Sequence, residues 1–164
     1  MTAREIFRLA LRIPEYLAGA MVLVLTALVN VEVALRYFLN MPVAQVDEVV
    51  RLLFVWISFL GAAVAVGKGA HMSLEFLQGR LSPRLYLLLG RLSILLVIAF
   101  GAYLAVDGVR FEGQAFASYL TITGWSTGWQ FLVVPLSGAL MVLYGIQVLL
   151  EMPRAQPVEE RLYE

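Results

Sequence analysis

Cysteine is absent from this 164-residue sequence, and histidine occurs once, as His71. The lack of cysteine excludes disulfides, thiolate metal sites and cysteine nucleophiles. One histidine cannot supply the paired axial ligands of a membrane b-type haem, and no glycine-rich phosphate-binding loop is present. No nucleophile-elbow pattern points to a Ser-His-Asp hydrolase either. The sequence therefore predicts a protein that is not an enzyme and has no catalytic residues, no metal site and no cofactor of its own.

Charged residues are also scarce. They make up 15% of the sequence, against 61% hydrophobic residues and a mean hydropathy of +0.83. A soluble domain is usually about one quarter charged, so the surplus apolar side chains are expected to face lipid. Twelve basic and twelve acidic residues cancel, which argues against a polyanionic partner such as nucleic acid.

Four apolar stretches approach or exceed the ~18–20 residues that a helix needs to cross a bilayer. They cover residues 16–35, 49–66, 85–106 and 129–150. We predict an all-α integral membrane bundle of four transmembrane helices over residues 1–152, with short interfacial helices in the loops and a cytoplasmic tail at 153–164. The first stretch follows several arginines, as in a signal peptide, but it is about 20 residues long and has no small-residue cleavage site. We expect it to be retained.

The basic residues predict how these helices are oriented. Nine lie on one side of the membrane, namely Arg4, Arg8, Arg12, Lys68, Arg80, Arg84, Arg91, Arg154 and Arg161. Three lie on the other side, namely Arg36, Arg51 and Arg110. By the positive-inside rule both termini are expected in the cytoplasm. The outer aromatic belt is then expected to hold Tyr103, Tyr119, Trp125 and Trp129.

The segment between the first two stretches carries paired charges. Glu32 and Arg36 are four residues apart, so they share a helix face and can form an ion pair. Asp47 and Arg51 have the same spacing. These charges either lie solvated at the level of the lipid headgroups or face a protein partner, because lipid tolerates them poorly. Ion binding by Glu32 is a further alternative.

A helix boundary is expected within the same segment. Pro42 prevents one continuous helix, and Asn40 suits the turn before it. A new helix is expected to start near Val43, with Asp47 and Glu48 early in it.

Small residues recur along the second stretch at four-residue spacing, at Gly61, Ala65 and Gly69 and again at Ala63 and Gly67. Such spacing lets helices approach closely in lipid, either within this chain or against a second protein. We expect Gly61→Leu to weaken the packing of the second helix. The last stretch has a sparser version of the pattern, at Gly138 and Gly145.

A polar turn follows the second stretch. Lys68 can reach anionic headgroups, and residues 74–81 are expected to form a short amphipathic helix in the interface. For His71 a structural hydrogen bond near the cytoplasmic surface is the simpler interpretation, because no second ligand lies nearby to support a metal or proton-relay role. Glu75 belongs to the same turn.

Several of these residues form a recognisable series, which consists of Glu32, Arg36-Tyr37-Phe38, Asn40, Pro42, Asp47-Glu48, Arg51, Phe54, Trp56, the run 59–63, Lys68 and His71. The series resembles the signature of the DctQ-like family, the small membrane subunit of tripartite ATP-independent periplasmic (TRAP) transporters. Gly113-Gln114 and Trp129 are weaker matches. Two positions depart from the family pattern: Val46 stands where an aromatic residue is common, and Glu75 where aspartate is usual.

The resemblance implies one subunit of a bacterial inner-membrane importer of organic acids, driven by sodium and not by ATP. The implied partners are a large permease subunit, a periplasmic binding protein that docks transiently, and membrane lipids. On this reading the partner or scaffold interface comprises Glu32, Arg36, Asn40, Asp47, Glu48, Arg51, Trp56, Gly61 and Ala65. The cytoplasmic turn near the headgroups comprises Lys68, His71 and Glu75.

Two other classes of function remain as alternatives. An independent oligomeric carrier or channel would need polar residues within the spans, and the last two stretches offer few beyond Ser93, Ser137 and Gln147. A membrane enzyme or electron-transfer subunit is disfavoured by the single histidine and the absence of cysteine. The leading hypothesis is therefore a non-catalytic scaffold subunit.

Overall fold

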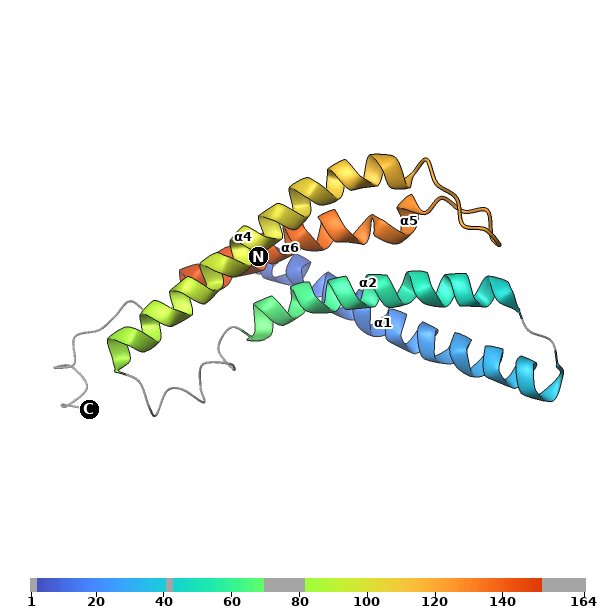
Figure 1. The fold of residues 1–164 in the computed structure, drawn as a ribbon. Helices are drawn as coiled ribbons and strands as arrows, with labels where there is room; N and C mark the ends of the chain where they lie inside the picture. The colour runs from blue at the N-terminus through green and yellow to red at the C-terminus, as the bar shows by residue number, and fades with distance from the viewer. Residues whose placement is uncertain (1–2, 41–42, 70–81, 152–164) are drawn as a thin grey trace.

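The computed structural model describes residues 3–40, 43–69 and 82–151. Within these residues the structure is all-helical, as predicted (Figure 1). The elements are α1 (Ala3–Phe38), α2 (Ala44–Gly69), α4 (Pro83–Ala115), the four-residue α5 (Gly128–Phe131) and α6 (Val133–Glu151). Four segments are long and apolar enough to cross a membrane: Arg12–Phe38, Ala44–Lys68, Leu87–Ala115 and Gly128–Glu151.

The helices extend past the apolar stretches from which they were predicted. α1 has 36 residues and α4 has 33, which at ~1.5 Å per residue makes each about 50 Å long, well beyond the ~30 Å of hydrocarbon in a bilayer. The stretch 85–106 in particular underestimates α4, which continues through Asp107 and Arg110 to Ala115. Hydropathy indicates where a helix leaves the lipid and not where the helix ends. The helix α4 therefore continues into water through residues that are polar but compatible with a helix.

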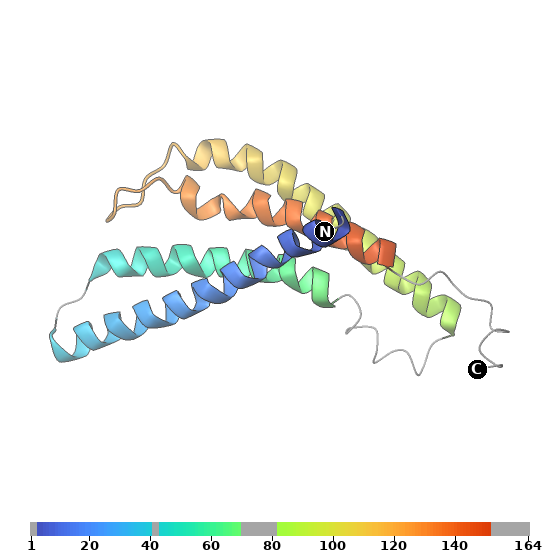
Figure 2. The same cartoon turned by 180° about the vertical axis from the view of Figure 1, so that it is seen from behind.

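The helices are arranged in a row. α4 packs against α6, α6 against α2, and α2 against α1. We call the end with the connections 39–43 and 116–127 the loop end, and the opposite end the terminal end. At the loop end the order α4, α5–α6, α2, α1 can be followed in Figure 1 and, from behind, in Figure 2. Towards the terminal end α1 crosses α2 and comes close to α6.

The helices α4 and α6 approach each other closely. A Cβ atom added to Gly138 would lie 2.6 Å from the backbone nitrogen of Ala105 and 2.7 Å from the carbonyl oxygen of Gly101. The two helices therefore touch backbone to backbone, which only glycine permits at this point. On Gly145 the added atom would lie 2.5 Å from the side chain of Ile98. The sparser pattern of small residues thus marks a helix contact within the chain.

The two stripes on α2 have different surroundings. Ala63 is fully buried, and a Cβ on Gly67 would lie 2.6 Å from the ring of Tyr144 on α6. A Cβ on Gly61 would meet no described atom within 4 Å, and Ala65 is exposed. Residues two positions apart in a helix point about 200° apart, so the stripes face opposite sides. The contacts among the described residues therefore give no partner to Gly61, and the prediction that Gly61→Leu weakens the packing of α2 stays a prediction about a contact with a second protein.

Candidate partner interface at the loop end

A charged cluster lies where α1 ends and α2 begins. Arg36 forms an ion pair with Glu32, one turn earlier in α1, as their spacing predicts. Its Nη2 atom also lies 3.8 Å from Oδ1 of Asp47, in the first turn of α2. Among the described residues Asp47 pairs with Arg36 and not with Arg51, so the second ion pair suggested by sequence spacing is not formed. Asp47 pairs with Arg36 because the end of α1 lies beside the start of α2, and the spacing of residues within α2 could not predict this pair.

The members of this cluster differ in exposure. Glu32 is buried, at 8% exposure, whereas the side chains of Arg36 and Asp47 are 48% and 56% exposed. An ion pair this accessible to water adds less than about 1 kcal/mol to stability. The Arg36–Asp47 contact therefore leaves both charges available to a further partner.

The connection between α1 and α2 starts with an unusual backbone conformation. The amide of Leu39 donates to the carbonyl of Leu35 at 3.2 Å, and Asn40 then has a φ of +49°. Asparagine tolerates this left-handed region better than most residues, because its short side chain can hydrogen-bond locally. Asn40 thus forms the turn that follows α1, as expected, while Pro42 lies outside the described residues.

Glu48 joins α2 to the connection between α4 and α5. One carboxylate oxygen accepts the backbone amide of Ile122 at 3.0 Å. The other accepts the amide of Thr123 at 2.8 Å and its hydroxyl at 2.6 Å. The residue is 8% exposed. Charge-assisted hydrogen bonds of this kind are stronger than those between neutral groups. Arg51, which is exposed, adds an electrostatic attraction to Glu48 from the next turn of α2.

The segment that Glu48 holds is an ordered hairpin. An antiparallel bridge joins Tyr119 to Ser126, and the amide of Thr127 donates to the carbonyl of Ser118 at 2.8 Å. Gly124 has a φ of +70° at its tip, a conformation natural for glycine. We call residues 118–127 the loop-end hairpin. Sequence analysis missed it, although the Thr-Gly pair at its tip is a turn signal.

Aromatic side chains complete the loop end. The indole nitrogen of Trp56, on α2, donates to the carbonyl of Trp129, on α5, at 2.9 Å. The rings of Trp129 and Phe116 meet edge to face, with centroids 5.8 Å apart. Tyr119 and Trp125 are exposed here together with Trp129.

The fourth residue of the predicted belt lies elsewhere. Tyr103 is on α4, about 18 Å before the end of that helix at ~1.5 Å per residue. Its hydroxyl lies 3.3 Å from a carboxylate oxygen of Asp107. Within the described chain, Tyr103 therefore does not join the aromatic residues of the loop end.

Trp56→Phe should loosen the contact between α2 and α5. The change keeps an aromatic ring but removes the indole donor, so the carbonyl of Trp129 loses a hydrogen bond worth about 1 kcal/mol. We expect a small drop in the thermal unfolding temperature of the purified protein in detergent. The matched control is Trp125→Phe, since Trp125 is 53% exposed on the hairpin. An equal effect of the two substitutions would contradict a specific role for the Trp56 bond.

At the terminal end, Lys68 forms an ion pair with Glu15 of α1. The predicted headgroup residues His71 and Glu75, and the predicted amphipathic helix at 74–81, lie outside the described residues.

Comparison with known proteins relates the chain to one kind of transport component. A family model described as "Tripartite ATP-independent periplasmic transporters, DctQ component" matches residues 9–154. The sialic acid TRAP transporter small permease protein SiaQ of Vibrio cholerae is 27% identical over 137 residues, which cover 82% of this chain and 78% of that protein. A putative TRAP transporter small permease protein of Haemophilus influenzae is 27% identical over 128 residues, covering 77% of this chain and 79% of that protein.

A third relative is a much longer protein. The sialic acid TRAP transporter permease protein SiaT of Haemophilus influenzae is 25% identical over 136 residues. The match covers 83% of this chain but 22% of SiaT.

Proposed function

The chain belongs to the DctQ family and is the small permease component of a TRAP transporter, and we propose that it acts there as a fixed scaffold for the large permease subunit. It is a multi-pass membrane protein of a bacterial transport system and not an enzyme. A TRAP component implies partner subunits, a large permease and a binding protein. The proposal concerns what this chain contributes to that assembly.

The row of helices is the observation that carries the scaffold proposal. In the part of the chain that the structure describes, four helices lie side by side, each packed mainly on its neighbours in the row, and they do not close a ring around a pathway for solute. Among the described residues the buried polar side chains are those of Glu32, Glu48, Gln130 and Ser137. The first three lie near the loop end, and the hydroxyl of Ser137 donates to a carbonyl of its own helix. A row of helices of this kind could extend the part of the large permease subunit that is embedded in the membrane.

A scaffold of this kind has a physical purpose in a carrier. When one part of a transporter moves across the bilayer, the remainder must stay in place, and additional lipid-embedded helices resist its displacement. We propose that the stripe of Gly61 and Ala65 packs against the large subunit, because Ala65 is exposed, a Cβ on Gly61 meets no described atom within 4 Å, and small residues permit close helix contact in lipid. The exposed charges of Arg36, Asp47 and Arg51 would lie at the rim of the same contact.

The proposal also covers the driving ion, the class of substrate and the orientation of the chain in the membrane. We propose sodium-driven uptake of an organic acid, supported by the sialic acid transporters among the relatives, since sialic acid is itself an organic acid. The distribution of basic residues supports cytoplasmic termini. The loop-end hairpin would then face the periplasm, where the binding protein docks. No cofactor in this chain is required.

The double substitution Arg36→Ala and Arg51→Ala tests the interface. Arg51 is exposed, but Arg36→Ala leaves the buried carboxylate of Glu32 without its cation, so the thermal unfolding midpoint of the isolated variant is measured beside its assembly. Recovery of the large subunit in a mild-detergent pull-down should fall severalfold, and substrate uptake with it. Arg110→Ala, which removes an exposed charge from α4, is the matched control. Wild-type behaviour of the double variant in both assays would remove these residues from the interface.

Reconstitution of this chain alone separates the scaffold from the independent carrier. Vesicles that contain only this polypeptide should not accumulate solute under a sodium gradient, whereas vesicles with the full membrane complex and the binding protein should. Uptake by the chain alone would overturn the scaffold proposal and support an oligomeric carrier.

A further inference from the structure

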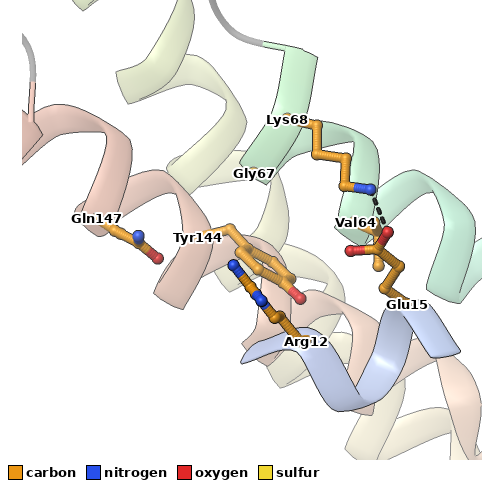
Figure 3. A pocket seen from close by; sticks show the side chains of 7 residues that line it. All are labelled: Arg12, Glu15, Val64, Gly67, Lys68, Tyr144 and Gln147. Carbon is orange, nitrogen blue, oxygen red and sulfur yellow. Dashed lines mark hydrogen bonds and ion pairs between the residues drawn. The ribbon is translucent and has the colours of Figure 1, made fainter. Parts of the chain in front are cut away.

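A polar cavity lies at the terminal end, where α1, α2 and α6 come together. Its volume is about 210 Å³. It is lined by Arg12, Glu15, Val64, Gly67, Lys68, Tyr144 and Gln147, as Figure 3 shows. A water molecule occupies ~30 Å³ in the liquid, so the cavity has room for a group of several heavy atoms.

The charges around this cavity do not cancel. The carboxylate of Glu15 and the ammonium group of Lys68 form an ion pair and neutralise each other. Arg12 extends from α1 beside the ring of Tyr144, and no carboxylate among the described residues lies within ion-pair distance of it (Figure 3). Among the described lining residues one positive charge is therefore left over, on a guanidinium group whose planar donors match a phosphate.

The depth of the cavity in the membrane indicates the source of that phosphate. Arg12 is the first residue of the apolar span of α1, and Lys68 is the last residue of the apolar span of α2. Both cations therefore lie at the same edge of the hydrocarbon, where phospholipid headgroups begin. On the lipid side of Arg12, the side chains of Ile13, Tyr16 and Leu17 are exposed and offer an apolar surface to an acyl chain.

We propose that this cavity binds the phosphodiester of a phospholipid headgroup, with Arg12 as its principal ligand. One phosphodiester neutralises the positive charge of Arg12, which has no ion-pair partner among the described residues. The Glu15–Lys68 pair forms the wall towards α2, and Gln147 lies on α6 at the same level. The site is independent of the scaffold proposal, because it uses neither the loop end nor the stripe of Gly61 and Ala65.

The test uses the complex of this chain with the large permease subunit, stripped of lipid in detergent. Dioleoyl-phosphatidylglycerol is titrated in, and bound lipid is counted by native mass spectrometry. We expect one retained lipid in the wild type, an affinity lower by about fivefold to tenfold in Arg12→Gln, and an intermediate affinity in Arg12→Lys, which keeps the charge but loses the planar pair of donors. Arg91→Gln, which removes an exposed charge from α4 outside the cavity, should bind like the wild type.

A second variant blocks the cavity without removing a charge. Val64→Phe should also lower retention of the lipid, because the larger side chain occupies the cavity.

Equal retention by Arg12→Gln and Arg91→Gln would overturn the proposal. Loss of the lipid on addition of inorganic phosphate at matched concentration would identify free phosphate as the ligand and overturn the lipid source. A photo-crosslinker at Val64 that captures the large subunit in place of lipid would assign the cavity to a protein contact instead.

Discussion

Gly138→Ala is expected to destabilise the protein, although the same change usually stabilises a helix. Alanine is favoured over glycine within a helix by ~1 kcal/mol. At Gly138, however, the new methyl group would lie 2.6 Å and 2.7 Å from backbone atoms of α4, and a backbone cannot rotate out of the way. The helices must separate, at a net cost of about 2 kcal/mol. Thermal unfolding in detergent, followed by circular dichroism, should show a midpoint lower by about 4–8 °C.

Two other glycines provide graded controls. Gly145→Ala places its methyl group against the side chain of Ile98, which can change rotamer, so the loss should be smaller. Gly61→Ala meets no described atom within 4 Å and should leave the isolated chain unchanged or slightly more stable. The predicted order of stability is therefore Gly61→Ala, then Gly145→Ala, then Gly138→Ala. A midpoint for Gly138→Ala at or above that of the wild type would contradict the backbone contact between α4 and α6.

Glu48→Ala is expected to release the loop-end hairpin while leaving the helices intact. The substitution removes the acceptor of three hydrogen bonds and leaves the amides of Ile122 and Thr123 without their partner. Hydrogen bonds to a charged group contribute about 1.5–3 kcal/mol, so the protection of these two amides against hydrogen exchange should fall about tenfold to a hundredfold. Exchange of the full complex in detergent, read by mass spectrometry on peptides spanning residues 116–127, measures the change.

Glu48→Gln separates charge from shape at the same position. Glutamine keeps one carbonyl oxygen but presents an NH₂ group where the second carboxylate oxygen was, so one side of the interaction becomes repulsive. Its effect should fall between those of the wild type and Glu48→Ala. Asp47→Asn is the matched control, because this neighbouring acid is 56% exposed and pairs with Arg36 instead of the hairpin. Unchanged exchange of the hairpin in Glu48→Ala would show that Glu48 does not hold it.

The predicted charge pairs show where spacing suffices and where it does not. Glu32 and Arg36 lie on one helix, four residues apart, and the ion pair follows from helix geometry alone. Asp47 has the same relation to Arg51, yet its described partner is Arg36, which lies across the connection between two helices. Local periodicity identifies which neighbours are available within a helix. Local periodicity does not reveal a residue on another helix that competes for the same ion pair.

Glu48 and the small residues illustrate the same limit over longer distances. In the sequence, Glu48 is one of several acidic residues at the edge of a span. Its partners Ile122 and Thr123 follow it by 74 and 75 positions, so these hydrogen bonds depend on how α2 and the hairpin are placed. The spacing of Gly61 and Ala65 equals that of Ala63 and Gly67, but only the second pair faces α6. A spacing rule describes a face that can pack closely, and which face does so depends on the neighbouring helix.

The four apolar helices, the turn at Asn40 and the family resemblance could be predicted without the fold, because hydropathy, backbone preference and residue identity are local properties. The order of the helices in the row, the backbone contact at Gly138, the anchoring of the hairpin by Glu48 and the cavity beside Arg12 became visible only in the folded chain. Each of these depends on two or more segments meeting, which is settled by packing of the whole chain.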